Sequence, residues 1–328
     1  MSSSPEKIRC SVVIATYCGA SRIGLTLASL ARQTLRPSDF EVVIIDDGSP
    51  ERARETLRKI IAAFMDVLQV SFVEADRNGG PAYARNLGLS RACGEIIFFT
   101  DDDCVLPAIW METHLRLYRE RPEVSLIGGW YRNLSSELTE NPYAMFADIN
   151  YASIFAPFNL YTYAGTSDQT GSLLLSHNTA NLSMRRSVLS LVPGFDETFV
   201  APGVEDLDFA VRARAAGFLS LYIPLLVRHA QKLSLKRFGR VVLNRALGNY
   251  VWHRKTGWAH YRPSTWRMRF SRYRDVLDAY AQRSAWVKKY RSQLLWMGYF
   301  HHFMVSSPVG LWIAKLRWRQ IVRRRCAF

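Results

Sequence analysis

The chain has 328 residues, of which 48% are hydrophobic and 22% are charged, and its formal net charge is +15. A sequence of this length and hydrophobicity buries a substantial core, either as one large α/β domain with an appendage or as two modest domains. The composition excludes intrinsic disorder and a collagen-like chain, and no internal period indicates a repeat array.

The positive charge is concentrated toward the C-terminus. Residues 229–328 contain 22 lysines and arginines against two acidic residues, Asp275 and Asp278, a balance of +20. Residues 1–228 contain 21 basic and 26 acidic residues, a balance of −5. A basic segment of this density indicates an anionic partner, which is either nucleic acid or the phospholipid face of a membrane.

Cysteine usage indicates a reducing compartment. The five cysteines stand at positions 10, 18, 93, 104 and 326 and form no CxxC pair. Their odd number and spacing indicate neither a disulfide framework nor a zinc site. The first residues, MSSSPEKIRC, lack the apolar core of a signal peptide, so we expect a cytoplasmic protein.

The first hundred residues alternate short apolar strands with helical segments, which predicts a parallel sheet built from βαβ units. We expect strands at 10–16, 40–47, 67–74 and 94–100. The intervening helices are expected at 21–33, near a Ser cap, at 51–64, and from Pro81 onward. Buried parallel strands carry functional residues at their carboxyl ends. Those ends hold Thr16, Asp46, Asp47 and the triplet Asp101, Asp102 and Asp103.

The middle of the chain is less regular. Residues 141–165 are aromatic and loop-rich, which fits either the wall of an acceptor cleft or an ordinary hydrophobic flank. A strand is expected within 178–186, a turn at 193–199, a helix from Glu205 that stops at Gly217, and a strand at 219–224.

From about Leu233 the pattern becomes helical and rich in Trp, Arg and Tyr. Residues 294–316 are apolar over nearly the length of a membrane span, about 20 residues, but His301, His302, Ser306, Ser307 and Pro308 interrupt the centre. Two short helices around Pro308 are the better interpretation. They lie either at a membrane interface, with Trp312 and Trp318 at headgroup depth, or against the rest of the protein with their arginines in water.

The aspartate triplet directly follows an apolar strand. Adjacent carboxylates repel one another unless a cation lies among them. Their hard oxygen atoms suit Mg2+ or Mn2+ better than zinc, and such a metal keeps positions open for diphosphate oxygens. The alternative is a solvated loop that caps the next segment.

A second acidic group, Glu205, Asp206 and Asp208, opens a helix. The helix dipole favours acidic residues there, which explains them without any function. A carboxylate across a cleft from a metal-bound leaving group instead acts as a general base on an acceptor hydroxyl. The two interpretations separate only if the two acidic groups are found together.

Taken together, these segments resemble the family 2 glycosyltransferases of the GT-A fold. The matching motifs are VVIATY, VVIIDDGS, NGGPAYARNLGL, GEIIFFTDDDCVLP, PGFDETF and VEDLDFAVRARAAGF followed by VRHA, and they cover about residues 8–229. The resemblance implies an α/β fold, with a GT-A Rossmann-like, mostly parallel sheet and flanking helices. Residues 1–230 are then a nucleotide-sugar-binding and catalytic domain, and residues 231–328 a basic, Trp-rich helical extension.

The resemblance also implies roles for individual residues. Asp206 is the expected catalytic base, with Glu205 as its neighbour in acceptor binding or as its substitute. The metal ligands implied are Asp101, Asp103 and His229. The residues implied in binding the nucleotide sugar are Thr16, Tyr17, Asp47, Asn78, Arg85, Asp101 and Asp102, with Gly79 and Gly80 allowing the backbone to come close.

Four further positions are less clear. Cys18 stands where the family commonly has Asn, and Pro193 where it commonly has Gly. His177 and Asn178 either face the acceptor or form a buried, hydrogen-bonded strand start, and we prefer the second interpretation.

The reaction implied is an inverting, metal-dependent transfer, with Mn2+ or Mg2+ as cofactor. The donor is a nucleotide-diphosphate sugar, a UDP-sugar first among them, and the acceptor is a hydroxyl of a glycan or lipid-linked molecule in cell-surface polysaccharide or glycolipid synthesis. We expect peripheral contact with the inner face of the cell membrane through the basic C-terminal region, and no nucleic-acid partner. The alternatives are a catalytically inactive nucleotide-sugar-binding protein and a nucleotidyltransferase, although the latter needs a Gly-rich, basic N-terminal loop that is absent here.

Overall fold

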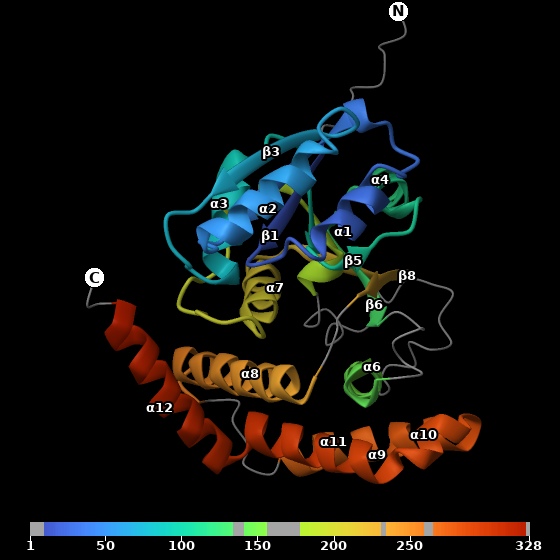
Figure 1. Ribbon diagram of the computed structural model, residues 1–328, viewed down its shortest axis with the longest axis vertical. Coiled ribbons are helices and arrows are strands. Elements are labelled where there is room, and N and C mark those ends of the chain that lie inside the picture. Colours follow the sequence, from blue (N-terminus) through green and yellow to red (C-terminus); the bar gives the residue numbers. More distant parts are fainter. Residues whose placement is uncertain (1–9, 134–140, 156–177, 231–233, 259–264, 326–328) are drawn as a thin grey trace, which may run out of the picture. The chain divides into compact units, whose positions relative to one another are not determined.

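The computed structural model describes residues 10–133, 141–155, 178–230, 234–258 and 265–325 (Figure 1). These residues divide into two compact units. The first lies within Met1–Arg132, Ala164–Val200 and Glu205–Ala230, and the second within Asn133–Tyr163, Ala201–Val204 and Gln231–Phe328. Residues 141–155, which the predicted boundary at residue 230 assigns to the first domain, belong to the unit that contains the C-terminal helices.

One mixed sheet forms the centre of the first unit. Its strands are β1 (Cys10–Thr16), β2 (Phe40–Asp46), β3 (Gln69–Glu74), β4 (Ile96–Asp101), β5 (Cys104–Val105), β6 (Val124–Asn133), β7 (Leu182–Arg185) and β8 (Leu219–His229). They lie in the order β3-β2-β1-β4-β7-β6-β8-β5. The first four strands pair in parallel, as expected from the sequence, and β7 pairs antiparallel with both β4 and β6.

Helices cover both faces of this sheet. They are α1 (Ile23–Leu30), α2 (Glu51–Ala62), α3 (Pro81–Arg91), α4 (Trp110–Glu120) and α7 (Glu205–Ala215), with the short 3-10 turns η1 (Pro37–Asp39), η4 (Thr179–Asn181) and η5 (Arg186–Ser190). Alternate residues of a strand point to opposite faces. Val12 and Ile14 of β1 accordingly pack with α1, α2 and α4, whereas Val13 packs with α3 and α7. The first helix begins at Ile23, later than expected, and no side chain caps it.

The register of the parallel strands places the carboxyl ends of β1, β2 and β4 side by side. Thr16 at the end of β1 lies opposite Asp46 of β2, and Ala15 lies opposite Asp101 of β4. At the other end of the strand order, β5 pairs antiparallel with β8, and Cys104 lies opposite His229. The residue that follows His229 is tied to the triplet, because the Ala230 amide donates to the Asp103 carbonyl at 2.7 Å.

The second unit is helical in its described residues. Its helices are α6 (Pro142–Phe155), α8 (Leu235–Lys255), α9 (Thr265–Arg283), α10 (Ala285–Lys289), α11 (Arg291–Ser306) and α12 (Pro308–Arg325). Phe146, Tyr273 and Leu294 belong to its buried core. Two helices do meet at Pro308, as the sequence predicted, and no helix in the described ranges is long and apolar enough to cross a bilayer.

Helix α6 corrects one expectation. The sequence predicts an aromatic, loop-rich segment at residues 141–165, but residues 142–155 form a helix. Apolar residues lie all around this helix instead of on one stripe, so the usual amphipathic signal is absent.

Candidate functional site

The three aspartates after β4 do not play the same part. Asp102 is buried, and Arg22 donates to both of its carboxylate oxygens, from Nε to Oδ1 at 3.1 Å and from Nη2 to Oδ2 at 2.8 Å. The Thr16 hydroxyl also donates to Oδ2 of Asp102, at 2.5 Å. The two oxygens of Asp102 therefore fasten the triplet to the end of β1 and to the loop that follows this strand. The roles of Thr16 and Asp102 in donor binding stay predictions.

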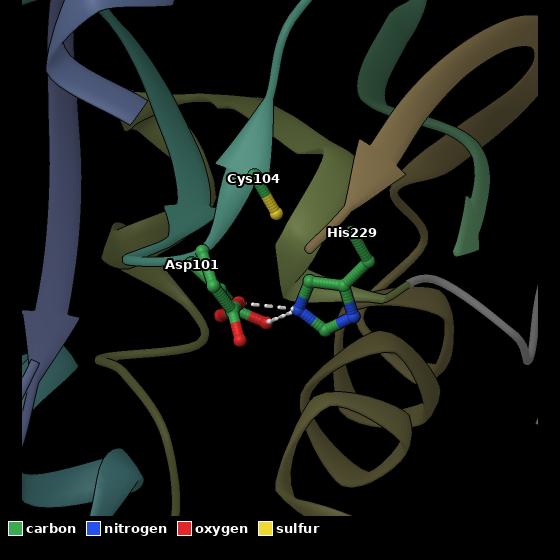
Figure 2. A group of neighbouring side chains, drawn as sticks. Asp101, Cys104 and His229 are labelled. Atoms are coloured by element: carbon green, nitrogen blue, oxygen red, sulfur yellow. Dashed lines mark ion pairs between the residues drawn. The ribbon is translucent and has the colours of Figure 1, made fainter. Parts of the chain in front are cut away.

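Asp101 and Asp103 instead lie beside His229. Figure 2 shows the Asp101 side chain pointing toward the His229 imidazole. The His229 Nε2 atom lies 2.6 Å from Oδ1 of Asp103 and 3.6 Å from Oδ2 of Asp101. Burial lowers the pKa of His229, but Asp103 and Cys104 together outweigh this effect through their charge and hydrogen bonds, so the pKa is raised well above its usual value. The imidazole thus lies in a strongly negative environment.

This group fits a divalent metal. Asp101, Asp103, Cys104 and His229 each offer one ligand atom, and these atoms lie within 4.8 Å of one another. Carboxylate and imidazole are common ligands of divalent metals in proteins. The three metal ligands predicted from the sequence are therefore brought together, and Cys104, which was not predicted, lies with them.

A buried arginine connects this group to the second acidic cluster. Arg85 of α3 contacts Oε1 of Glu205 through Nη1 at 2.8 Å and Oδ1 of Asp101 through Nη2 at 3.4 Å. The side chains of Arg85 and Glu205 are only 8% and 4% exposed. The role of Arg85 in binding the nucleotide stays a prediction. In the structure this arginine lies between the two acidic clusters and brings them into one site.

Asp206 stands beside this bridge in the first turn of α7 and keeps part of its surface exposed. Its pKa is raised to about 7, first because the surrounding protein desolvates the carboxyl and then because Glu205 carries a like charge, while Arg85 opposes the shift. A general base works best when its pKa lies near the operating pH. The environment of Asp206 therefore suits proton abstraction near neutral pH.

The segments predicted to hold the nucleotide adjoin β1 and β2. The Asp47 carboxylate accepts the amides of Gly79 at 2.7 Å and Gly80 at 2.9 Å, and the Asn78 side chain donates to the Asp47 carbonyl at 3.0 Å. Asp47 thereby fixes the loop that precedes α3. Tyr17 is 49% exposed, so its ring is accessible to a ligand. The donor roles of these residues stay predictions.

One glycine of that loop is required by its conformation. Gly80 has φ of +88°, and a Cβ atom there would lie 2.8 Å from the Val200 carbonyl oxygen. The positive φ and the short distance to the carbonyl oxygen each disfavour a side chain at this position. The close approach of the loop to its neighbours thus depends on glycine.

Two of the remaining expected positions can be placed. Asn178 caps η4 by accepting the Ala180 amide at 2.8 Å, in line with the structural interpretation preferred for it. Cys18 adopts φ of +51°, which is unusual for a residue other than glycine. His177 lies outside the described residues.

Comparison with known proteins assigns the family. The model of the family described as "Glycosyl transferase family 2" matches residues 11–190. The chain belongs to glycosyl transferase family 2. The sequence resemblance is thus confirmed.

Relatives of this family 2 chain include a validoxylamine A glucosyltransferase of Streptomyces hygroscopicus subsp. limoneus, with 29% identity over 63% of the chain and 48% of the relative. The glycosyltransferase AglE of Haloferax volcanii is 27% identical over 63% of the chain and 62% of the relative. The chain therefore spans about half to three-fifths of the length of these relatives.

Solved structures share the fold. The mannosyltransferase PcManGT from Pyrobaculum calidifontis, in complex with GDP-Man and Mn2+, superposes with a TM-score of 0.62 at 18% identity, covering 95% of this chain and 87% of the other. S. aureus TarS residues 1–349, in complex with UDP-GlcNAc, gives a TM-score of 0.54 at 15% identity and covers 91% and 90%. The expected α/β fold of the GT-A type is confirmed.

Two residues of the site were missed from the sequence. Arg22 lies in a loop with no signal beyond its charge, and its partner Asp102 is 80 positions away. Cys104 directly follows the triplet, and this adjacency was the one feature of the sequence that could have indicated its place in the site. Its approach to His229 comes from the pairing of β5 with β8, which local pattern does not reveal.

Proposed function

We propose that this chain is an inverting, metal-dependent glycosyltransferase. It moves a sugar from a nucleotide-diphosphate sugar to a hydroxyl of a glycan or lipid-linked acceptor. The observation that carries the proposal is the Arg85 bridge, which joins Asp101 of the candidate metal group to Glu205, the residue before the candidate base. If Glu205 and Asp206 served only to stabilise the start of α7, no contact with a buried arginine would be expected. The contact of Arg85 with both Glu205 and Asp101 therefore favours a functional role for the acidic helix start.

The residues divide the chemistry between them. Asp101, Asp103 and His229 would hold Mn2+ or Mg2+, which when bound supplies positive charge against the departing diphosphate. Asp206 accepts the proton of the acceptor hydroxyl as that oxygen attacks the anomeric carbon. Arg85 fixes Glu205 beside it. A single displacement of this kind inverts the anomeric centre and needs no covalent nucleophile.

The donor proposed is a nucleotide-diphosphate sugar, with a UDP-sugar first. Support comes from the named relatives and neighbours, among them a glucosyltransferase, a TarS complex with UDP-GlcNAc and a mannosyltransferase complex with GDP-Man. A role in cell-surface polysaccharide or glycolipid synthesis is in keeping with the poly(ribitol-phosphate) β-N-acetylglucosaminyltransferase TarS of Staphylococcus aureus, 34% identical over 28% of this chain.

The test is a panel of nucleotide sugars, each offered with Mn2+ or with Mg2+ and scored by calorimetric binding and by donor hydrolysis. The proposal expects one or a few donors to bind only with metal and to be consumed. NMR of the product would show the anomeric configuration opposite to that of the donor. Binding without consumption would favour an inactive sugar-nucleotide-binding protein. In a parallel assay with nucleoside triphosphates and sugar phosphates, release of pyrophosphate would favour a nucleotidyltransferase.

We also propose a cytoplasmic location at the inner face of the cell membrane. The support lies in α11 and α12, where Trp296, Val309 and Trp312 are 55%, 53% and 60% exposed on a segment rich in arginine. Exposed Trp and basic residues together suit the interface of an anionic bilayer. Salt-sensitive binding to vesicles that contain phosphatidylglycerol, weakened by Trp312→Ala, is expected. Binding to oligonucleotides instead would contradict this location.

A further inference from the structure

We propose that Cys104 is a fourth ligand of the divalent metal site formed with Asp101, Asp103 and His229, and that this site therefore favours a thiophilic ion such as Zn2+ or Co2+ over Mg2+. The inference rests on the metal role proposed above, and adds to it a ligand and a selectivity.

Strand pairing directs the thiol toward the site. Cys104 of β5 and His229 of β8 are directly opposite in an antiparallel pair. Opposite residues of such a pair project on the same side of the sheet, with Cβ atoms about 4.5–5.5 Å apart. Figure 2 shows the sulfur of Cys104 pointing toward the space between Asp101 and His229. The fold thus fixes the thiol beside the imidazole and does not leave it to a flexible loop.

The Cys104 thiol is hydrogen-bonded to the His229 imidazole, a candidate ligand of the same group, and contacts outside this group do not account for its orientation. Cys104 is fully buried, and the further contact made by its Sγ is with the Ala180 carbonyl at 4.0 Å, a long distance even for sulfur. A buried cysteine usually behaves as a small apolar residue among apolar neighbours. Here the sulfur instead lies within 4.8 Å of the ligand atoms of two carboxylates and an imidazole. Of the other described cysteines, Cys10 is buried in the core and the two at positions 18 and 93 are exposed.

The thiol changes which metal the group suits. Mg2+ takes oxygen ligands in a near-ideal octahedron, and sulfur does not serve it. Thiolate and imidazole together suit Zn2+ and its neighbours in the first transition row. On binding, the S–H proton leaves to solvent and the metal–sulfur bond forms, with no change in oxidation state.

Coordination number then separates activating from inhibiting ions. Tetrahedral Zn2+ bound by all four side chains would have no position left for diphosphate oxygens, as in closed structural sites. A six-coordinate ion such as Mn2+ would keep two positions. We therefore expect Zn2+ to bind tightly and to compete with Mn2+-dependent donor binding.

The direct test is X-ray absorption spectroscopy of the 328-residue protein loaded with one equivalent of Zn2+, which needs no variant. The expected result is one sulfur scatterer at about 2.3 Å. With Co2+, the same ligand gives a thiolate-to-metal charge-transfer band in the near ultraviolet. A shell of nitrogen and oxygen only, with no such band, would overturn the inference while leaving a metal-dependent glycosyltransferase intact.

Variants assign the sulfur to a residue. Cys104→Ser should abolish the band and lower Zn2+ affinity by at least about tenfold, while Mg2+ affinity is unchanged. The matched controls Cys18→Ser and Cys93→Ser should keep both. If Cys104→Ser does not fold, the Cys18→Ser/Cys93→Ser/Cys326→Ser protein still reports on the buried thiol, because its two remaining cysteines are Cys104 and the core residue Cys10. A band that persists in folded Cys104→Ser would refute the assignment, and failure of any divalent ion to bind would refute the metal role as well.

Discussion

Removing the charge of Glu205 is the sharpest structural perturbation of the site. Glu205→Gln keeps the size of the side chain but leaves the Arg85 guanidinium, whose side chain is 8% exposed, without the carboxylate 2.8 Å away. Breaking a buried ion pair by removing one partner costs about 3–5 kcal/mol, because the remaining charge stays desolvated. Asp101 remains 3.4 Å from Arg85 and is 30% exposed, so it compensates only in part.

We therefore expect Glu205→Gln to lower the free energy of unfolding by about 3 kcal/mol, roughly a hundredfold in the unfolding equilibrium constant. Urea unfolding, monitored by tryptophan fluorescence, measures this change in the free energy of unfolding. The double variant Arg85→Met/Glu205→Gln should lose less than the sum of the two single losses, because neither member of the buried pair is left charged without the other.

An exposed pair provides the control. Arg116 and Glu120 on α4 are 2.9 Å apart and 55% and 52% exposed. Glu120→Gln should change stability by no more than about 0.5 kcal/mol. A loss below about 1 kcal/mol for Glu205→Gln, similar to that of the control, would mean that Arg85 is solvated, and the argument for a buried bridge would fail.

Three other perturbations have defined outcomes. Because the base must be deprotonated and the pKa of Asp206 is raised to about 7, kcat/KM should fall about tenfold per pH unit below that value; an acid limb near pH 4 would contradict it. Gly248→Ala should destabilise the protein by about 1–3 kcal/mol, since its Cβ would lie 2.6 Å from Cγ2 of Val204. The control Gly239→Ala on the same helix meets nothing within 4 Å, and thermal unfolding should show a slight stabilisation. Asp102→Asn should lower the free energy of unfolding, measured by urea denaturation, by about 2 kcal/mol, because it weakens charge-assisted hydrogen bonds. Unchanged stability would show that this carboxylate does not fasten the loop.

The first four strands could be predicted from the sequence because each is a short apolar run that ends in polar residues. The strand that ends at Thr16 was predicted with its observed bounds. The helix that opens at Glu205 and its stop before Gly217 were likewise predicted, from an acidic first turn and a terminal glycine. Local pattern is sufficient where the signal lies within one element.

Elements that depend on distant partners were missed. The two-residue strand at Cys104 has no pattern of its own and exists because it pairs with the end of β8. The sequence indicated which residue types gather at strand ends, but not that Asp102 would turn to Arg22 while its neighbours face His229. That division depends on a side chain from another segment, and spacing alone does not encode it.

The most direct test of the central claim is to compare two variants in one experiment, with calorimetric donor binding and donor turnover measured in parallel in the presence of Mn2+. Asp103→Asn should lose metal-dependent donor binding. Asp206→Asn should bind the donor as the unaltered protein does and lose turnover by at least about a hundredfold. Turnover at the original rate in Asp206→Asn, or unchanged metal-dependent binding in Asp103→Asn, would contradict the account.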